Sequence, residues 1–160
     1  MFETIVGWVV KISPKFLHFL FRWFYSSEKL TNMIGVTIGS ENEGIVVNCS
    51  GLPEARAWVE ITNLSPFELN LVGTEANLIW VGKVAEFTSM QRLSIKRHSK
   101  IQILLETSLT ELQSKHIEET NHMERPRLYI SLYFESSIRL INKVRSIETS
   151  NARLLNCKST

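Results

Sequence analysis

The sequence is poor in the residues that most often build chemical sites. It has only two cysteines and four histidines in 160 residues, and none of them form a set with metal-ligand spacing. A glycine-rich phosphate loop, a nucleophile elbow and a Ser/His/Asp arrangement are also missing. We therefore predict no catalytic residue, no metal site and no cofactor, and we expect a protein that is not an enzyme.

An excess of charge of one sign is lacking as well. The chain has 18 Lys and Arg residues against 16 Asp and Glu residues, which gives a formal net charge of +2. Such a small excess does not favour a nucleic-acid partner. A hydrophobic fraction of 44% and a charged fraction of 21% are typical of a folded protein. The length corresponds to one domain with an appended element.

The two cysteines, Cys49 and Cys157, are too few for a disulfide scaffold. We expect Cys49 to be a small buried residue and Cys157 to lie in a flexible tail over residues 149–160. A single long-range bridge between them is the alternative.

The N-terminal segment, residues 1–30, lacks an uninterrupted apolar run that could cross a membrane. Most residues between Phe2 and Tyr25 are apolar, but a basic or ionisable residue interrupts them at every turn. A spanning helix needs about 20 consecutive apolar residues. The interrupting residues are spaced by four, three and four, so a helix places them on one stripe, which Lys29 would extend. An aromatic face beside a thin cationic stripe is typical of a helix in the membrane interface.

We predict that this amphipathic helix binds an anionic membrane surface or a protein partner, including a second copy of the chain. The alternative is that it packs on its own domain. Ser13 and Pro14 are a good N-cap and first helical residue, so the segment is expected to contain a second helix over Lys15–Tyr25. The predicted contact residues are Trp8, Lys11, Lys15, Phe16, His18, Phe19, Arg22, Trp23 and Phe24.

Residues 31–148 change to a period of two, which indicates β-strands. Clear examples place Ala57, Val59 and Ile61 on one face, and Leu128, Ile130, Leu132 and Phe134 on another. About seven short, half-buried strands joined by short turns predict a mainly β, immunoglobulin-like, two-sheet antiparallel sandwich.

One short helix interrupts the late strands. Ser108 and Glu111 have the spacing of a capping box, and Leu109, Leu112 and Ile117 could form its buried stripe as far as about Glu119.

A basic run follows the strand that contains Leu93 and Ile95. Its predicted basic surface consists of Arg92, Lys96, Arg97 and Lys100. The run could face anionic lipid or an acidic partner. It could equally protect a sheet edge against unwanted strand pairing.

The segment from Ala57 to Phe67 resembles the signature of the group 2 late embryogenesis abundant (LEA) proteins, also called the water-stress and hypersensitive-response (WHy) domain. There an alternating strand enters an Asn-Pro-x-Pro-Phe-like turn; Asn63, Pro66 and Phe67 fit this pattern, and Leu64 replaces the first proline. The element order over residues 35–147, including a turn at Gly82-Lys83, is also similar. The resemblance implies an immunoglobulin-like sandwich without enzyme activity. The N-terminal helix lies outside it.

We expect Asn63 to form an Asx-type bond with the backbone, Pro66 to end the first strand's pairing, and Phe67 to re-enter the core.

Three hypotheses follow. The first is a non-enzymatic, membrane-associated adaptor or accessory subunit, anchored by its helix at the cytoplasmic face and using the sandwich for protein or lipid binding. The second is an assembly subunit whose helix packs into an oligomer or a partner. The third is a soluble stress-protective protein of the resembled family.

Overall fold

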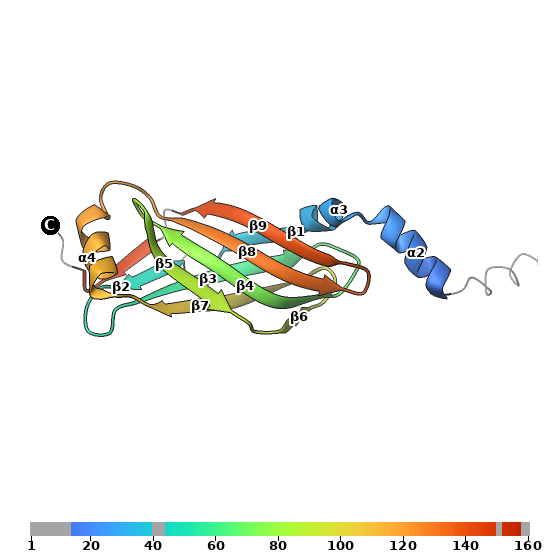
Figure 1. Ribbon diagram of the computed structural model, residues 1–160, viewed down its shortest axis with the longest axis horizontal. Helices are drawn as coiled ribbons and strands as arrows, with labels where there is room; N and C mark the ends of the chain where they lie inside the picture. Colours follow the sequence, from blue (N-terminus) through green and yellow to red (C-terminus); the bar gives the residue numbers. More distant parts are fainter. Residues whose placement is uncertain (1–13, 40–43, 150–151, 158–160) are drawn as a thin grey trace, which may run out of the picture.

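The predicted strands form two sheets. The computed structural model describes residues 14–39, 44–149 and 152–157. Sheet A contains β1 (Ile34–Ile38), β2 (Ile45–Asn48), β3 (Glu54–Asn63), β7 (Ser99–Ser108) and β10 (Ala152–Leu155). Sheet B contains β4 (Leu69–Ile79), β5 (Lys83–Ser89), β6 (Leu93–Ile95), β8 (Arg127–Ser136) and β9 (Leu140–Glu148). The predicted β-sandwich is confirmed (Figure 1).

Each sheet is built on one long strand with an uninterrupted neighbour on one side and two shorter strands on the other. In sheet A, β7 pairs with β3 along its whole length, and β1 and β2 lie end to end on the opposite side. In sheet B, β8 pairs with β4, and β5 and β6 lie end to end opposite β8. These two divided positions, together with β10 in the expected tail, account for the ten strands of the described residues against about seven predicted.

The core lies between the sheets, where the period of two predicts it. Ala57, Val59 and Ile61 of β3 are fully buried, and the alternate residues of β8 from Leu128 to Phe134 are at most 1% exposed. Burial of a side chain such as Ile61 stabilises the fold by about 1.5–3 kcal/mol. Leu104, which interrupts the alternation of β7, is 40% exposed on the outer face.

Two helices precede the sandwich. Helix α2 (Pro14–Phe24) begins at the predicted proline and projects from one end of the sandwich (Figure 1). Helix α3 (Ser27–Asn32) starts anew, because the Ser26 hydroxyl accepts a hydrogen bond from Lys29 N at 3.2 Å and Ser26 has extended backbone angles. Lys29 therefore lies on a different helix and does not extend the cationic stripe of α2.

The boundary expected at residue 30 also differs from the structure. Leu30 of α3 is fully buried in the core, and α3 packs against β9 and β1. Helix α3 thus belongs to the sandwich, and the appended segment ends before it.

Helix α4 (Glu111–Thr120) closes the opposite end (Figure 1). Its capping box uses Thr110 and Gln113, so the prediction of Ser108 and Glu111 is wrong; Ser108 is still paired with Glu54 at the end of β7. The later start changes the buried stripe to Ser114, Ile117 and Thr120 and leaves Leu112 81% exposed.

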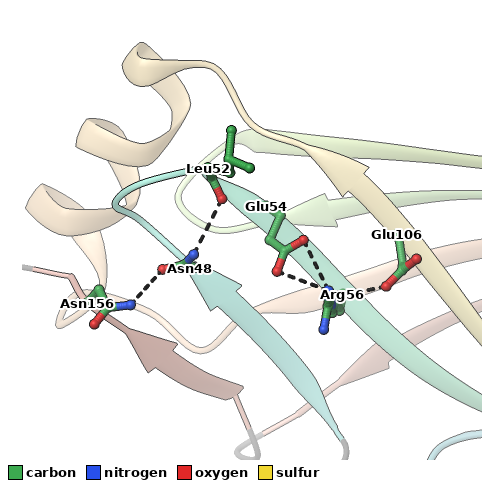
Figure 2. Close-up of polar contacts among 6 residues, drawn as sticks. All are labelled: Asn48, Leu52, Glu54, Arg56, Glu106 and Asn156. Carbon is green, nitrogen blue, oxygen red and sulfur yellow. Dashed lines mark hydrogen bonds and ion pairs between the residues drawn. The ribbon is translucent and has the colours of Figure 1, made fainter.

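The C-terminal segment differs from the flexible tail that we expected. β10 pairs with β2 in parallel, which makes sheet A mixed rather than wholly antiparallel. Cys157 forms a disulfide with Cys49, 108 residues earlier, so the alternative reading of the two cysteines is the correct one. Figure 2 shows this end of the sandwich, where Asn156 Nδ2 donates to Asn48 Oδ1 at 3.0 Å.

Candidate functional site

The exposed face of α2 is the most unusual surface of the described chain. Phe19, Trp23 and Phe24 are 65%, 74% and 59% exposed, although they are large apolar side chains. The rings of Trp23 and Phe24 lie 5.4 Å apart. An exposed aromatic cluster of this kind marks a surface that meets a membrane or another protein.

The other side of α2 is attached to the sandwich through Phe67. The Phe67 ring meets the edges of Phe21 and Tyr25, with centroids 5.8 and 5.0 Å away. The Arg139 guanidinium, from the turn between β8 and β9, donates to the backbone carbonyl of Arg22 at 2.7 Å. Phe19 and Trp23, which are one turn apart, therefore lie on the side of α2 opposite Phe21, whereas Phe24, three residues after Phe21, is exposed nearer the Phe21 side.

Phe67 therefore has a different role from the one predicted. It is only partly buried, and it joins the core to α2 rather than lying wholly inside the core.

Asn63 holds the adjoining turns together. Its side-chain amide is buried, and Nδ2 donates to the carbonyls of Phe67, Ile95 and Lys96 at 2.8, 3.1 and 3.1 Å. Its Oδ1 accepts from Ser65 N at 2.9 Å, which confirms the predicted Asx-type bond. The bonds to Ile95 and Lys96 cross more than 30 residues, so local sequence reasoning could not find them.

Only two of the four residues of the predicted basic surface lie together as charges that are unpaired within the described part of the chain. Lys96 and Arg97 lie exposed in the turn between β6 and β7, beside Asn63 and hence beside the attachment point of α2. Lys100 Nζ lies 3.0 Å from Glu60 Oε2, so its charge is paired across sheet A. Arg92 stands at the far end of β6.

The structure describes the predicted contact residues of the N-terminal segment unevenly. Trp8 and Lys11 lie outside the described residues, and the backbone of Lys15, Phe16 and His18 belongs to α2. Sequence analysis missed Phe21, Phe67 and Arg139 as positioning residues, because their roles depend on contacts between distant segments.

A buried lysine fixes α3 beside this surface. Lys143 is 8% exposed, and its Nζ donates to the Thr31 carbonyl in the last turn of α3 at 2.9 Å. A cation is favourable at a helix C-terminus. Burial lowers the pKa of Lys143, and the charge of Arg145 lowers it further.

Among the described residues, no group of three or more His, Cys, Asp or Glu side chains could hold a metal ion. A depression of about 610 Å³ lies beside Cys49, Pro53 and α4. Within residues 14–39, 44–149 and 152–157, no helix is both long enough and apolar enough to cross a membrane.

Fold and site together define a β-sandwich that carries an exposed aromatic helix. No family model matches the chain, and no curated protein matches it. Its structure is similar to the X-ray structure of the Northeast Structural Genomics Consortium target SoR45, with a TM-score of 0.51 and 15% identity over 74% of this chain and 87% of that one. This likeness supports the fold alone.

Two further likenesses are weaker. One is to a protein from Archaeoglobus fulgidus, with a TM-score of 0.40 and 13% identity over 73% of this chain and 95% of that one. The other is to the solution structure of a protein assigned to the LEA proteins, with a TM-score of 0.35 and 14% identity over 93% of this chain and 87% of that one.

Proposed function

We propose that the protein is a non-enzymatic membrane-surface adaptor, which α2 attaches to the interface of a membrane that contains anionic lipid. The observation that carries this proposal is the exposure of Phe19, Trp23 and Phe24 on α2, with Phe19 and Trp23 on the side opposite the contact of Phe21 with Phe67. Aromatic rings are favourable at the boundary between headgroups and acyl chains.

The charges near α2 support the same partner. Arg22 is exposed on α2, and the sequence spacing places Lys15 and His18 on the same stripe. Long basic side chains can reach lipid phosphates while the neighbouring rings enter the apolar layer.

An adaptor also needs a surface for a protein partner. The outer face of β8 and β9 carries Tyr129, Leu140 and Val144, which are 48%, 74% and 56% exposed. β8 and β9 belong to sheet B and are separate from α2. We therefore propose their outer face as the surface for a protein partner, in addition to the membrane contact of α2.

The disulfide helps to infer on which side of the membrane the sandwich lies. Structural disulfides persist in oxidising compartments and are rare in the cytosol. The Cys49–Cys157 bridge supports a sandwich on an oxidising side of the membrane, in place of the cytoplasmic face that the basic residues suggested. Alkylation of intact cells with a maleimide reagent tests this placement: both thiols should react only after reduction.

Vesicle co-sedimentation tests the membrane proposal. The full chain is compared with Phe19→Ser/Trp23→Ser/Phe24→Ser, using vesicles with and without phosphatidylglycerol. We expect the triple variant to bind at least about tenfold more weakly, because each ring loses part of its transfer free energy. The matched control, Leu52→Ser/Met90→Ser/Leu112→Ser, removes three side chains that are 87%, 74% and 81% exposed elsewhere, and should bind like the natural chain.

If the natural chain does not sediment with either vesicle type, the membrane proposal is wrong. A stable oligomer or a stoichiometric partner that is lost only in the Phe19/Trp23/Phe24 variant would then support the assembly role of α2.

A further inference from the structure

The turn between β6 and β7 lies at the same end of the sandwich as α2. A continuous series of contacts connects them: the Phe67 ring packs on Phe21, the Phe67 carbonyl accepts from Asn63, and Asn63 also donates to the Lys96 carbonyl. The position of the turn is therefore fixed relative to the attachment of α2, through a buried amide rather than through exposed side chains.

The turn presents unpaired positive charge. Lys96 and Arg97 are exposed, and neither has an ion-pair partner among the described residues. Lys100, three residues further on, is neutralised by Glu60. The nearby Glu68 carboxylate accepts a hydrogen bond from Ser94 on β6. The two charges are thus free to meet an external anion.

The backbone of the turn keeps these side chains outside the sheet. His98 has a φ of 52°, a left-handed conformation that reverses the chain directly after Arg97. The Ser99 hydroxyl donates to the Lys96 carbonyl at 2.7 Å and tightens the turn. Lys96 and Arg97 consequently stand at the tip of a tight, hydrogen-bonded turn.

We propose that Lys96 and Arg97 form a second contact with anionic lipid headgroups, beside the aromatic contact of α2. This inference rests on the proposed membrane attachment and adds to it a second contact site and the orientation of the sandwich. With contacts at both α2 and the β6–β7 turn, the sandwich stands with this end toward the membrane and with α4 and the disulfide away from it (Figure 1).

The size of the effect follows from general membrane electrostatics. One Lys or Arg close to an anionic surface strengthens binding about fivefold at moderate ionic strength. Loss of both charges should therefore weaken binding to anionic vesicles about twentyfold and leave binding to neutral vesicles unchanged.

The test compares the full chain with Lys96→Gln/Arg97→Gln on phosphatidylcholine vesicles with and without about one third phosphatidylglycerol. The matched control is Lys115→Gln/Arg153→Gln, which removes one Lys and one Arg from exposed positions on α4 and β10 at the opposite end. The swap Lys96→Arg/Arg97→Lys keeps both charges and should bind like the natural chain.

The expected result is weaker binding to anionic vesicles for Lys96→Gln/Arg97→Gln alone. Equal losses in this variant and in the control would overturn the inference, because net charge rather than position would then govern binding. Unchanged vesicle binding combined with new aggregation would also overturn it and favour protection of a sheet edge. If the natural chain itself fails to bind, the membrane attachment and this inference both fail.

Discussion

Different kinds of contact hold the two ends of the sandwich together. At the α4 end, the last strand is fixed by a covalent bond, Cys49–Cys157, and by exposed hydrogen bonds around Asn48 (Figure 2). At the α2 end, two turns and a helix meet around the buried amide of Asn63 and the ring of Phe67. The contacts at the α4 end attach β10 to the sandwich, whereas the contacts at the α2 end position a helix with exposed aromatic rings.

The two ends also differ in the apolar side chains that they expose. The α4 end buries Leu109 and Ile117 but exposes the aliphatic Leu52 and Leu112, whereas the α2 end exposes the rings of Phe19, Trp23 and Phe24. We place the proposed binding surface at the α2 end because a group of exposed aromatic rings is more informative than single exposed leucines.

We expect the largest effect when the disulfide at the α4 end is removed. Replacing both cysteines, Cys49→Ser/Cys157→Ser, should lower the free energy of unfolding by about 3–5 kcal/mol, because the bridge closes a loop of 108 residues. Denaturant unfolding, followed by circular dichroism, measures this. Amide exchange should also rise in β10, which has no other covalent tie. A loss below about 1 kcal/mol would show that the parallel pairing alone holds β10.

The second prediction compares two asparagines, one at each end. Asn63→Ala should cost about 2–4 kcal/mol, because three buried or partly buried carbonyls and the Ser65 N–H lose their partner. Asn48→Ala should cost less than about 1 kcal/mol, since its two hydrogen bonds are exposed. Chemical denaturation of both variants measures the difference. Equal costs would contradict the central role given to Asn63.

The third prediction concerns pH and the attachment of α3. The pKa of Lys143 is lowered in the folded state, so the unfolded chain holds this proton to higher pH than the folded chain. The stability of the natural chain relative to Lys143→Met should therefore rise with pH, between the lowered folded pKa and the unfolded value near 10.5. The slope should stay below about 1.4 kcal/mol per pH unit.

Urea unfolding of both proteins from pH 7 to 10.5 measures this difference. Lys115→Met, at an exposed position of α4, is the matched control and should show no such rise. A relative stability that falls over the same range would mean that burial does not disfavour the Lys143 charge.

The smallest expected effect compares the caps of the two short helices. Thr110→Ala should destabilise the fold by about 1 kcal/mol, because it removes one half of a capping box. Ser26→Ala should cost about 0.5–1 kcal/mol, since Ser26 forms a single exposed cap bond. Thermal unfolding measures both costs; a larger cost for Ser26 would show that α3 depends on its own cap more than on Leu30 and Lys143.

The sequence predicted the parts of the fold that local patterns control. The period of two located the buried faces of β3 and β8, and Pro14 located the start of α2. The capping box was placed wrongly because Ser108–Glu111 and Thr110–Gln113 both fit its spacing. The choice depends on how far β7 pairs with β3, which is a tertiary property.

The candidate site shows the same limit. The spacing of Lys15, His18 and Arg22 revealed an amphipathic helix, although the local Ser26 cap that places Lys29 on a new helix was missed. Local sequence could not show that the Phe67 ring meets Phe21. Nor could it show that Arg139 binds the Arg22 carbonyl from 117 residues away, or that Cys157 reaches Cys49. These contacts exist only once both sheets have formed.

The most direct test of the account is the fluorescence of Trp23 in the presence of vesicles that contain phosphatidylglycerol with brominated acyl chains. Trp23→Phe is the reference, because the two proteins differ only at Trp23 and share Trp8, Trp58 and the buried Trp80. The account predicts that vesicles shift the natural chain's emission to the blue and quench it, and that the Trp23→Phe variant shows a clearly smaller change. Equal spectra with and without vesicles, at concentrations where the chain is folded, would contradict the claim that the aromatic face of α2 enters a membrane.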